Sequence, residues 1–280
     1  MRRRELITLL SGAVVAWPLV ARAQRAVKRP IIGFFSPNTR LVALPWTTAF
    51  VQRLHELDWI EDRTVTITYR YGEGSTEHIA EFVAEFVRLQ VDVIVTHGEA
   101  NFAAAMKATS VIPIIFAIAA DPIGSGLIAS LARPGGNIAG LSLQASELAG
   151  KRLELLREVV PGLRRLAIMV DMDSRAAVLE TREVQAMAGP LGLEVIPLEI
   201  KRAEDIAPAF EALKGRAADA LYVCAVPLEN TNRVRINTLA LVARLPSMNG
   251  FREPVEAGAL MSYGPNFPEI HRAAAILPAF

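Results

Sequence analysis

The chain has 280 residues, of which 52% are hydrophobic and 21% charged, with a formal net charge of +1 and a single cysteine, Cys224. This length and apolar content can bury one large core or two of ordinary size. The near-neutral charge excludes a strongly basic nucleic-acid-binding protein, and the lone cysteine excludes an intrachain disulfide and a cysteine-based metal cluster.

The first residues have the features of an export signal. The basic stretch 2–4 precedes an apolar run at 6–20 that is too short to span a membrane comfortably, and Ala21 and Ala23 supply the small-residue pattern that a signal peptidase accepts. The basic head fits a twin-arginine signal or an ordinary Sec signal, and no nearby cysteine could carry a lipid. We therefore expect 1–23 to be a signal peptide and the mature protein to be periplasmic and not a lipoprotein.

Strand-like apolar runs alternate with helical patterns along the rest of the chain. The first half predicts strands at 31–36, 64–71, 91–98, 112–117 and 137–143, with helices at 45–58, 76–89, 99–108 and 123–131. The second half predicts helices at 146–159, 174–188, 203–213 and 229–243, with strands at 163–171, 193–200, 218–226, 245–251 and 258–264.

Strands that alternate with helices of this length form parallel sheets through right-handed crossovers. Because two such sets follow each other, we predict two Rossmann-like α/β lobes with a ligand cleft between them. The N-terminal lobe comprises 30–140 and is completed by 258–280, and the C-terminal lobe comprises 141–257.

The carboxyl ends of the predicted strands carry small and polar residues with few ionisable groups. Ligands bind at these ends in open parallel sheets. Such a lining is typical of a recognition cleft more than of a reaction centre.

One turn resembles a dinucleotide-binding motif, because Gly124, Gly126 and Ala129 follow the pattern G-x-G-x-x-A. However, Asp121 places a negative charge where a pyrophosphate would lie, and the motif follows the fourth strand instead of the first. We therefore interpret these glycines as serving chain geometry and expect no cofactor.

His97 and Glu99 flank a glycine at a strand end, where they could act as an acid–base pair or as two metal ligands. No third ligand is evident, because His55, His78 and His271 lie on predicted helices and are interpreted as solvated or packed surface groups. Asp171 and Asp173 resemble paired carboxylates, although such a pair before Ser174 more often forms a turn and an N-cap. Cys224 lies in an apolar strand and is predicted to be core. We predict no metal site and no catalytic activity.

Three segments resemble one family in the same order along the chain. They are "DPIGSGLIASLARPGGNIAGLS" at 121–142, "KRLELLREVVPGLRRLAIMVD" at 151–171 and "GALMSYGPNFPEIHRAAA" at 258–275. They are similar to the substrate-binding proteins of tryptophan/tyrosine-type ABC transporters. The resemblance covers nearly all of 30–275 and implies a periplasmic-binding-protein type I fold. It also implies a monomer that delivers a small molecule to an inner-membrane permease and its ATPase, with no nucleic-acid partner.

In this fold the lobes close over the ligand. The residues expected to contact it are Ser36, His97, Gly98, Glu99, Ala117 and Asp121 on the first lobe, and Asp171, Tyr222, Ala225, Asn249 and Tyr263 near the second lobe or the hinge.

Two kinds of ligand remain open. An amino-acid zwitterion would place its ammonium on Asp121 and its carboxylate on the helix N-termini after Ser36 and Gly98. A neutral ligand such as a nucleoside would leave Asp121 as a helix cap. A ligand-sensing module acting on a receptor or kinase, and an exported hydrolase dependent on His97 or Asp171, are the alternative functions.

The sequence departs from the family in two places. His97 and Glu99 stand where members of the family carry a small residue and a threonine or serine. The final stretch 276–280 does not resemble the family's continuation, which we interpret as a truncation or a frameshift.

Overall fold

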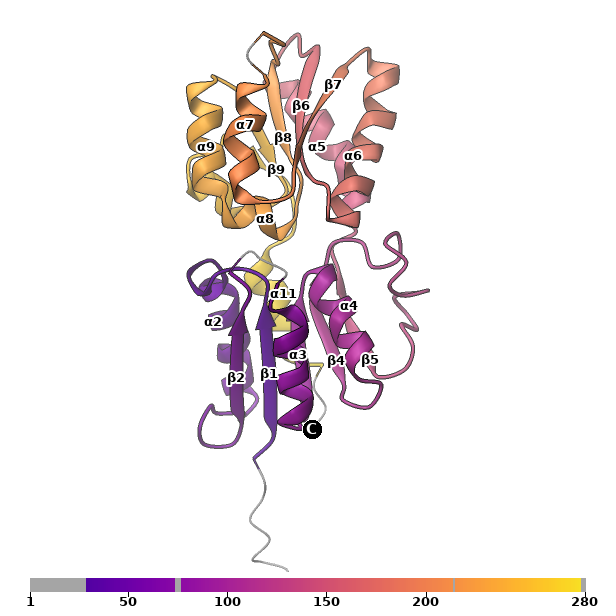
Figure 1. Ribbon diagram of the computed structural model, residues 1–280, viewed down its shortest axis with the longest axis vertical. Coiled ribbons are helices and arrows are strands. Elements are labelled where there is room, and N and C mark those ends of the chain that lie inside the picture. The colour runs from indigo at the N-terminus through magenta and orange to yellow at the C-terminus, as the bar shows by residue number, and fades with distance from the viewer. Residues whose placement is uncertain (1–28, 74–76, 214, 278–280) are drawn as a thin grey trace, which may run out of the picture.

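The computed structural model describes residues 29–73, 77–213 and 215–277, which form two α/β lobes stacked along the long axis of the molecule (Figure 1). The predicted signal peptide, 1–23, lies outside the described residues. Each lobe contains a five-stranded sheet, and every strand pair within the two sheets is parallel. The predicted two-lobe α/β fold is therefore confirmed.

The sheet of the first lobe has the strand order β2-β1-β3-β4-β5. Its strands are β1 (Ile31–Ser36), β2 (Thr66–Tyr71), β3 (Val93–His97), β4 (Ile114–Ala119) and β5 (Ile138–Ser142). Its helices are α2 (Arg40–Glu56), α3 (Ile79–Arg88) and α4 (Glu99–Ala108). β3 and β4 are buried along their whole length, as expected for strands covered on both faces by helices.

Helix α2 begins five residues before the predicted start at Pro45. The side chain of Thr39 accepts a hydrogen bond from the backbone N–H of Val42 and so caps the helix, and Pro45 lies inside it. The N-cap at Thr39 therefore determines where this helix begins. Proline is also accepted in the first turn of a helix, but Pro45 does not mark the start here.

The predicted helix at 123–131 is absent, and turns and bends occupy this stretch. Asp121 accepts a hydrogen bond from the N–H of Gly124 through its own side chain, at 2.8 Å, and Gly126 has a φ of +72°. These local turns compete with a helix. The glycine motif consequently opens no helix that could hold a pyrophosphate.

The sheet of the second lobe has the order β10-β9-β8-β6-β7. Its strands are β6 (Arg165–Asp171), β7 (Glu194–Ile200), β8 (Ala220–Val223), β9 (Ser247–Asn249) and β10 (Met261–Ser262). Its helices are α5 (Ala145–Val159), α6 (Arg175–Ala188), α7 (Ile206–Glu211), α8 (Pro227–Thr231), α9 (Arg233–Val242) and α10 (Glu253–Glu256). The predicted helix at 229–243 is thus divided, with Asn232 between α8 and α9.

The chain crosses between the lobes after β5 and again after β10. Because β10 pairs with β9, the stretch 258–262 belongs to the second lobe and not to the first, where the sequence had placed it. Helix α11 (Phe267–Ala274) then returns to the first lobe and packs against α2, and Arg272 forms an ion pair with Glu56 there at 2.5 Å.

Among the described residues, no helix is both long enough and apolar enough to cross a membrane. The same part of the chain contains no group of three or more His, Cys, Asp or Glu side chains placed to hold a metal ion.

Candidate ligand-binding site

A cavity of about 380 Å³ lies between the two lobes, at the carboxyl ends of the parallel strands. The loops and helix starts that follow β1, β3 and β4 line it from the first lobe, and those that follow β6 and β8 line it from the second. This is where an open parallel sheet binds its ligand. The volume is in the range of small-molecule sites.

The structure brings together about half of the side chains expected to contact a ligand. The residues of that set that line the cavity are His97, Gly98, Glu99, Asp171 and Ala225. Those that lie outside its lining are Ser36, Ala117, Asp121, Tyr222, Asn249 and Tyr263.

His97 lies at the end of β3 and belongs to a buried chain of hydrogen bonds. His271 places Nδ1 at 3.0 Å from the carbonyl oxygen of Phe267, which can only accept, so this nitrogen carries the proton. His271 Nε2 then accepts from His97 Nδ1 at 3.4 Å, and His97 Nε2 lies 3.1 Å from the Ser36 hydroxyl and 3.3 Å from Asn38 Oδ1. These contacts hold the two imidazole rings together at the end of β3.

The interpretation of His271 as a surface or helix-packing group is corrected by this contact, because the ring is fully buried against the cavity wall. Burial lowers the pKa of His271 from 6.5 to about 4. Burial, with the neighbouring His271, also lowers the pKa of His97 well below its ordinary value. Both rings are therefore neutral near pH 7.

Aromatic rings form part of the wall. Trp46 stacks on His271 and meets His97 and Phe267 edge to face, with ring centroids 5.7, 5.5 and 5.3 Å apart. Phe251 from the second lobe packs on Phe267 at 4.6 Å, and Trp46, Phe251 and Phe267 all line the cavity. Trp46 and Phe267 were not predicted as contacts because they lie in helices α2 and α11, away from any strand end. Phe251 closes the strand predicted at 245–251, but of that strand only Asn249 was expected to contact the ligand.

Gly98 and Glu99 begin helix α4 at the cavity. Gly98 has a φ of +83°, and a Cβ there would lie 3.2 Å from the Pro37 ring, so the turn favours glycine for both reasons. Glu99 accepts a hydrogen bond from the backbone N–H of Asp121 at 3.0 Å. Burial raises the pKa of the Glu99 carboxyl, although hydrogen bonds, with Asp121 first among them, oppose the rise.

Asp171 ends β6 on the opposite wall and organises the start of α6. Its Oδ1 accepts from the backbone N–H of Asp173 at 2.9 Å, and Ser174 caps the helix by accepting from Ala177. These are the turn and N-cap roles that the sequence left open for this pair. Burial raises the pKa of Asp171, and Glu229 accepts from its backbone N–H at 3.1 Å.

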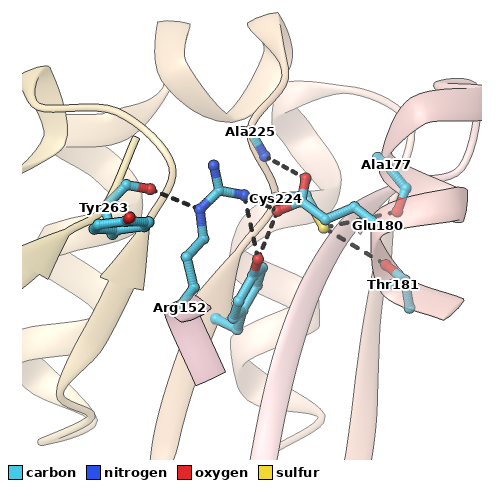
Figure 2. A network of polar contacts seen from close by, with 8 residues as sticks. Arg152, Ala177, Glu180, Thr181, Cys224, Ala225 and Tyr263 are labelled. Atoms are coloured by element: carbon cyan, nitrogen blue, oxygen red, sulfur yellow. Dashed lines mark hydrogen bonds and ion pairs between the residues drawn. The ribbon is translucent and has the colours of Figure 1, made fainter. Parts of the chain in front are cut away.

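Behind Ala225 lies a buried ion pair. Arg152 Nη1 contacts Glu180 Oε1 at 2.5 Å, and Glu180 Oε2 accepts from the Ala225 backbone N–H at 3.1 Å (Figure 2). Arg152 Nε also donates to the carbonyl oxygen of Tyr263 at 2.7 Å. The network therefore joins α5, α6, the cavity loop and the crossover after β10.

Tyr222 belongs to this network. Contrary to the prediction, it does not line the cavity. Its hydroxyl donates to Glu180 at 2.6 Å, because β8 directs this side chain into the core of the second lobe. Burial and the adjacent Glu180 raise the pKa of Tyr222 well above its ordinary value. Burial lowers the pKa of Arg152, but Glu180 and Tyr222 outweigh that effect and the net direction is upward.

The other predicted contacts lie outside the lining for local reasons. Ala117 points into the core of the first lobe, and Ser36 lies behind His97 with none of its surface exposed. Asn249 is buried in β9, Tyr263 takes part in the network through its backbone, and Asp121 caps its own turn.

The chemistry of the cavity is that of recognition. Ser36 and His97 are placed like a nucleophile and its base, but Ser36 lies behind His97 and is not part of the cavity lining, so its hydroxyl does not face a molecule in the cavity. The lining is largely apolar and aromatic, and its described residues include three acidic side chains, Glu99, Asp171 and Asp173, and a single arginine, Arg175.

Comparison with known proteins agrees with this geometry. Residues 46–277 match the family described as ABC transporter substrate binding protein. A protein of Clostridioides difficile (strain R20291) named "Tyrosine-binding protein" is 24% identical over 221 residues, which are 79% of this chain and 63% of that protein. The chain thus spans less than two thirds of this relative's length.

Two solved structures share the fold. A conserved domain protein from Vibrio cholerae has a TM-score of 0.82 at 21% identity, covering 89% of this chain and 83% of that one. An ABC domain from Streptococcus pneumonia in complex with L-Trp has a TM-score of 0.79 at 20% identity, covering 88% of this chain and 83% of that one. With its two parallel sheets and the cavity between them, and with the family match over most of its length, this chain belongs to the ABC transporter substrate-binding proteins and has the periplasmic-binding-protein type I fold.

Proposed function

We propose that this protein is the extracytoplasmic solute-binding component of an ABC importer and that it binds an aromatic amino acid in the cavity between its lobes. The observation that carries the proposal is the composition of the cavity wall. Trp46, Phe251 and Phe267 supply flat apolar surface, and a preponderance of carboxylates over basic groups favours a ligand with an ammonium group.

The comparisons support the same ligand class. A relative is named for tyrosine, and a structure of the same fold contains L-Trp. The predicted signal at 1–23 supports export to the periplasm, where such a protein would meet its permease and ATPase. On this proposal the protein is a binding component and not an enzyme.

The test is calorimetric titration of the mature protein with L-tryptophan, L-tyrosine, L-phenylalanine, L-leucine and uridine. We expect saturable binding of at least one aromatic amino acid and weaker binding of leucine and uridine. A folded protein that binds none of the aromatic amino acids would overturn the proposal, and preferential binding of uridine would favour a neutral ligand.

A pair of alanines on α4 provides the matched control. Ala103 lines the cavity, whereas Ala108 lies on the exposed surface of the same helix. Ala103→Trp fills the cavity and should abolish binding, while Ala108→Trp should leave the affinity unchanged. Uptake of labelled tryptophan by cells with and without the gene then tests import.

A further inference from the structure

Among the residues that the structure describes, two asparagines in the cavity wall have side chains without a hydrogen-bond partner. Asn101 is 0% exposed and Asn230 is 2% exposed, and within the described part of the chain neither the oxygen nor the nitrogen of either carboxamide has a partner. Buried amides are almost always paired, because leaving them unpaired costs free energy. Each pair of unmatched atoms therefore needs an explanation.

The two side chains come from different lobes. Asn101 is the third residue of α4 in the first lobe, and Asn230 is the fourth residue of α8 in the second. Both line the cavity. A molecule that occupies the cavity therefore lies next to one of these asparagines from each lobe.

A third buried asparagine shows what a structural role looks like in this fold. Asn237 does not line the cavity, and its Nδ2 donates to the carbonyl oxygens of Pro254 at 2.7 Å and Ala257 at 3.1 Å. Among the described residues only its Oδ1 lacks a partner, whereas both polar atoms do at Asn101 and Asn230. It thereby ties α9 to the stretch around α10. Asn101 and Asn230 have no such bonds, so packing alone does not account for them.

We propose that Asn101 and Asn230 bind the head group of a free α-amino acid, with the carboxamide oxygens accepting from its ammonium and the NH₂ groups donating to its carboxylate. This inference rests on the proposed function and deepens it, since it names the residues that bind the head group common to all α-amino acids. A carboxamide offers both donors and acceptors, so it suits a zwitterion without adding net charge.

The same arrangement means that binding of the ligand favours closure of the two lobes. Its head group is fully paired only when both lobes contribute, and an amine or an acid alone leaves carboxamide atoms unmatched. Sites built around buried polar groups reject analogues that lack the matching group. The carboxylates Glu99 and Asp171 in the wall further disfavour a ligand that carries a carboxylate without an ammonium.

The experiment uses Asn101→Leu and Asn230→Leu, which nearly preserve side-chain shape, with L-tryptophan, tryptamine and indole-3-propionate as probes. We expect wild type to bind L-tryptophan at least tenfold more tightly than either analogue. Each leucine variant should lose about tenfold to hundredfold in affinity for L-tryptophan and discriminate less against at least one analogue. Without ligand, its melting temperature should equal or exceed that of wild type, because an unpaired polar group has been removed.

Asn237→Leu is the matched control. It should lower the melting temperature through its lost hydrogen bonds and leave the affinity of the folded protein unchanged. If wild type binds L-tryptophan and both cavity variants bind it within twofold of wild type, this inference is wrong while the proposed function stands. If Asn101→Leu and Asn230→Leu are as destabilised as Asn237→Leu, their roles are structural and the inference is also wrong. If wild type binds no aromatic amino acid, both proposals fail.

Discussion

The two lobes support their sides of the cavity in different ways. In the wall of the first lobe, His97 and the buried His271 form a neutral pair that ends at a backbone carbonyl and packs against Trp46. Behind the wall of the second, Arg152 and Glu180 form an ion pair whose side chains are each 1% exposed.

The difference predicts different weaknesses. A neutral chain is inexpensive to bury while it remains neutral, so it is sensitive to protonation. A buried ion pair is insensitive to pH near neutrality, but the loss of one partner leaves the other charge unmatched in the core. We therefore expect acid to destabilise the first lobe, and substitution of one ion-pair partner to destabilise the second.

The largest expected effect comes from breaking the ion pair. Glu180→Leu leaves Arg152 charged and buried and removes the acceptor that holds the Ala225 backbone. We expect the free energy of unfolding to fall by about 3–5 kcal/mol, as measured by urea denaturation. The double variant Arg152→Met with Glu180→Leu should recover much of this loss. A single variant as stable as wild type would show that the pair is not buried in solution.

Acid should destabilise the protein through the first lobe. The pKa of His271 is about 4 when folded, against an ordinary value of 6.5, so the unfolded chain takes up the proton first as the pH falls. The stability is fully present above about pH 6.5 and is lost as the pH falls toward 4. At about 1.4 kcal/mol per pH unit, His271 accounts for about 3 kcal/mol, and His97 adds in the same direction.

Urea denaturation from pH 7 to pH 4 measures this effect. His271→Gln should flatten the dependence on pH, because the variant lacks the titrating group. His55→Gln is the control, because His55 is exposed on α2 of the same lobe and its replacement should leave the profile unchanged. An unchanged profile in His271→Gln would mean that the acid sensitivity arises elsewhere.

A contact between the lobes should have a smaller effect. Trp46 Nε1 donates to Glu253 Oε1 at 2.7 Å, joining α2 of the first lobe to α10 of the second. Trp46→Phe keeps a ring but loses the donor, so we expect the affinity for L-tryptophan to fall by about 1 kcal/mol. Trp59→Phe makes the same change outside the cavity lining and should leave the affinity unchanged. An unaltered affinity in Trp46→Phe would show that this hydrogen bond does not contribute to ligand binding.

The sequence predicted the fold well because the fold depends on repeating local patterns. Each buried strand followed by a helix is visible as an apolar run, and the rule that ligands bind beyond strand ends correctly located His97, Gly98 and Ala225 at the cavity. The helix at 123–131 was predicted wrongly because the turn that Asp121 makes with its own backbone overrides helical spacing.

The polar networks could not be predicted in the same way. Arg152 and Glu180 are 28 positions apart on two amphipathic helices, where charged residues are normally assigned to the solvent face. His271 meets His97 across 174 positions, and no local pattern indicates that distance. Asn101 lies two residues beyond Glu99, so searching one helical turn past each strand end would have found it.

The smallest expected effect concerns Asp121, and it tests whether the first lobe uses this charge in binding. The sequence offered Asp121 as the partner of a ligand ammonium, but its side chain accepts from Gly124 at 2.8 Å and does not line the cavity. Asp121→Asn retains an oxygen for Gly124, so stability should change by less than about 1 kcal/mol and the affinity for L-tryptophan should not change. Asp121→Ala removes the cap and should cost about 1 kcal/mol of stability, again without a change in affinity. If Asp121→Asn instead weakens binding by about 1.5–3 kcal/mol, the scale of a hydrogen bond to a charged group, then Asp121 reaches the ligand. The first lobe would in that case bind through a charge on the turn after β4, and the contrast between its neutral wall and the charged core of the second lobe would not extend to the ligand.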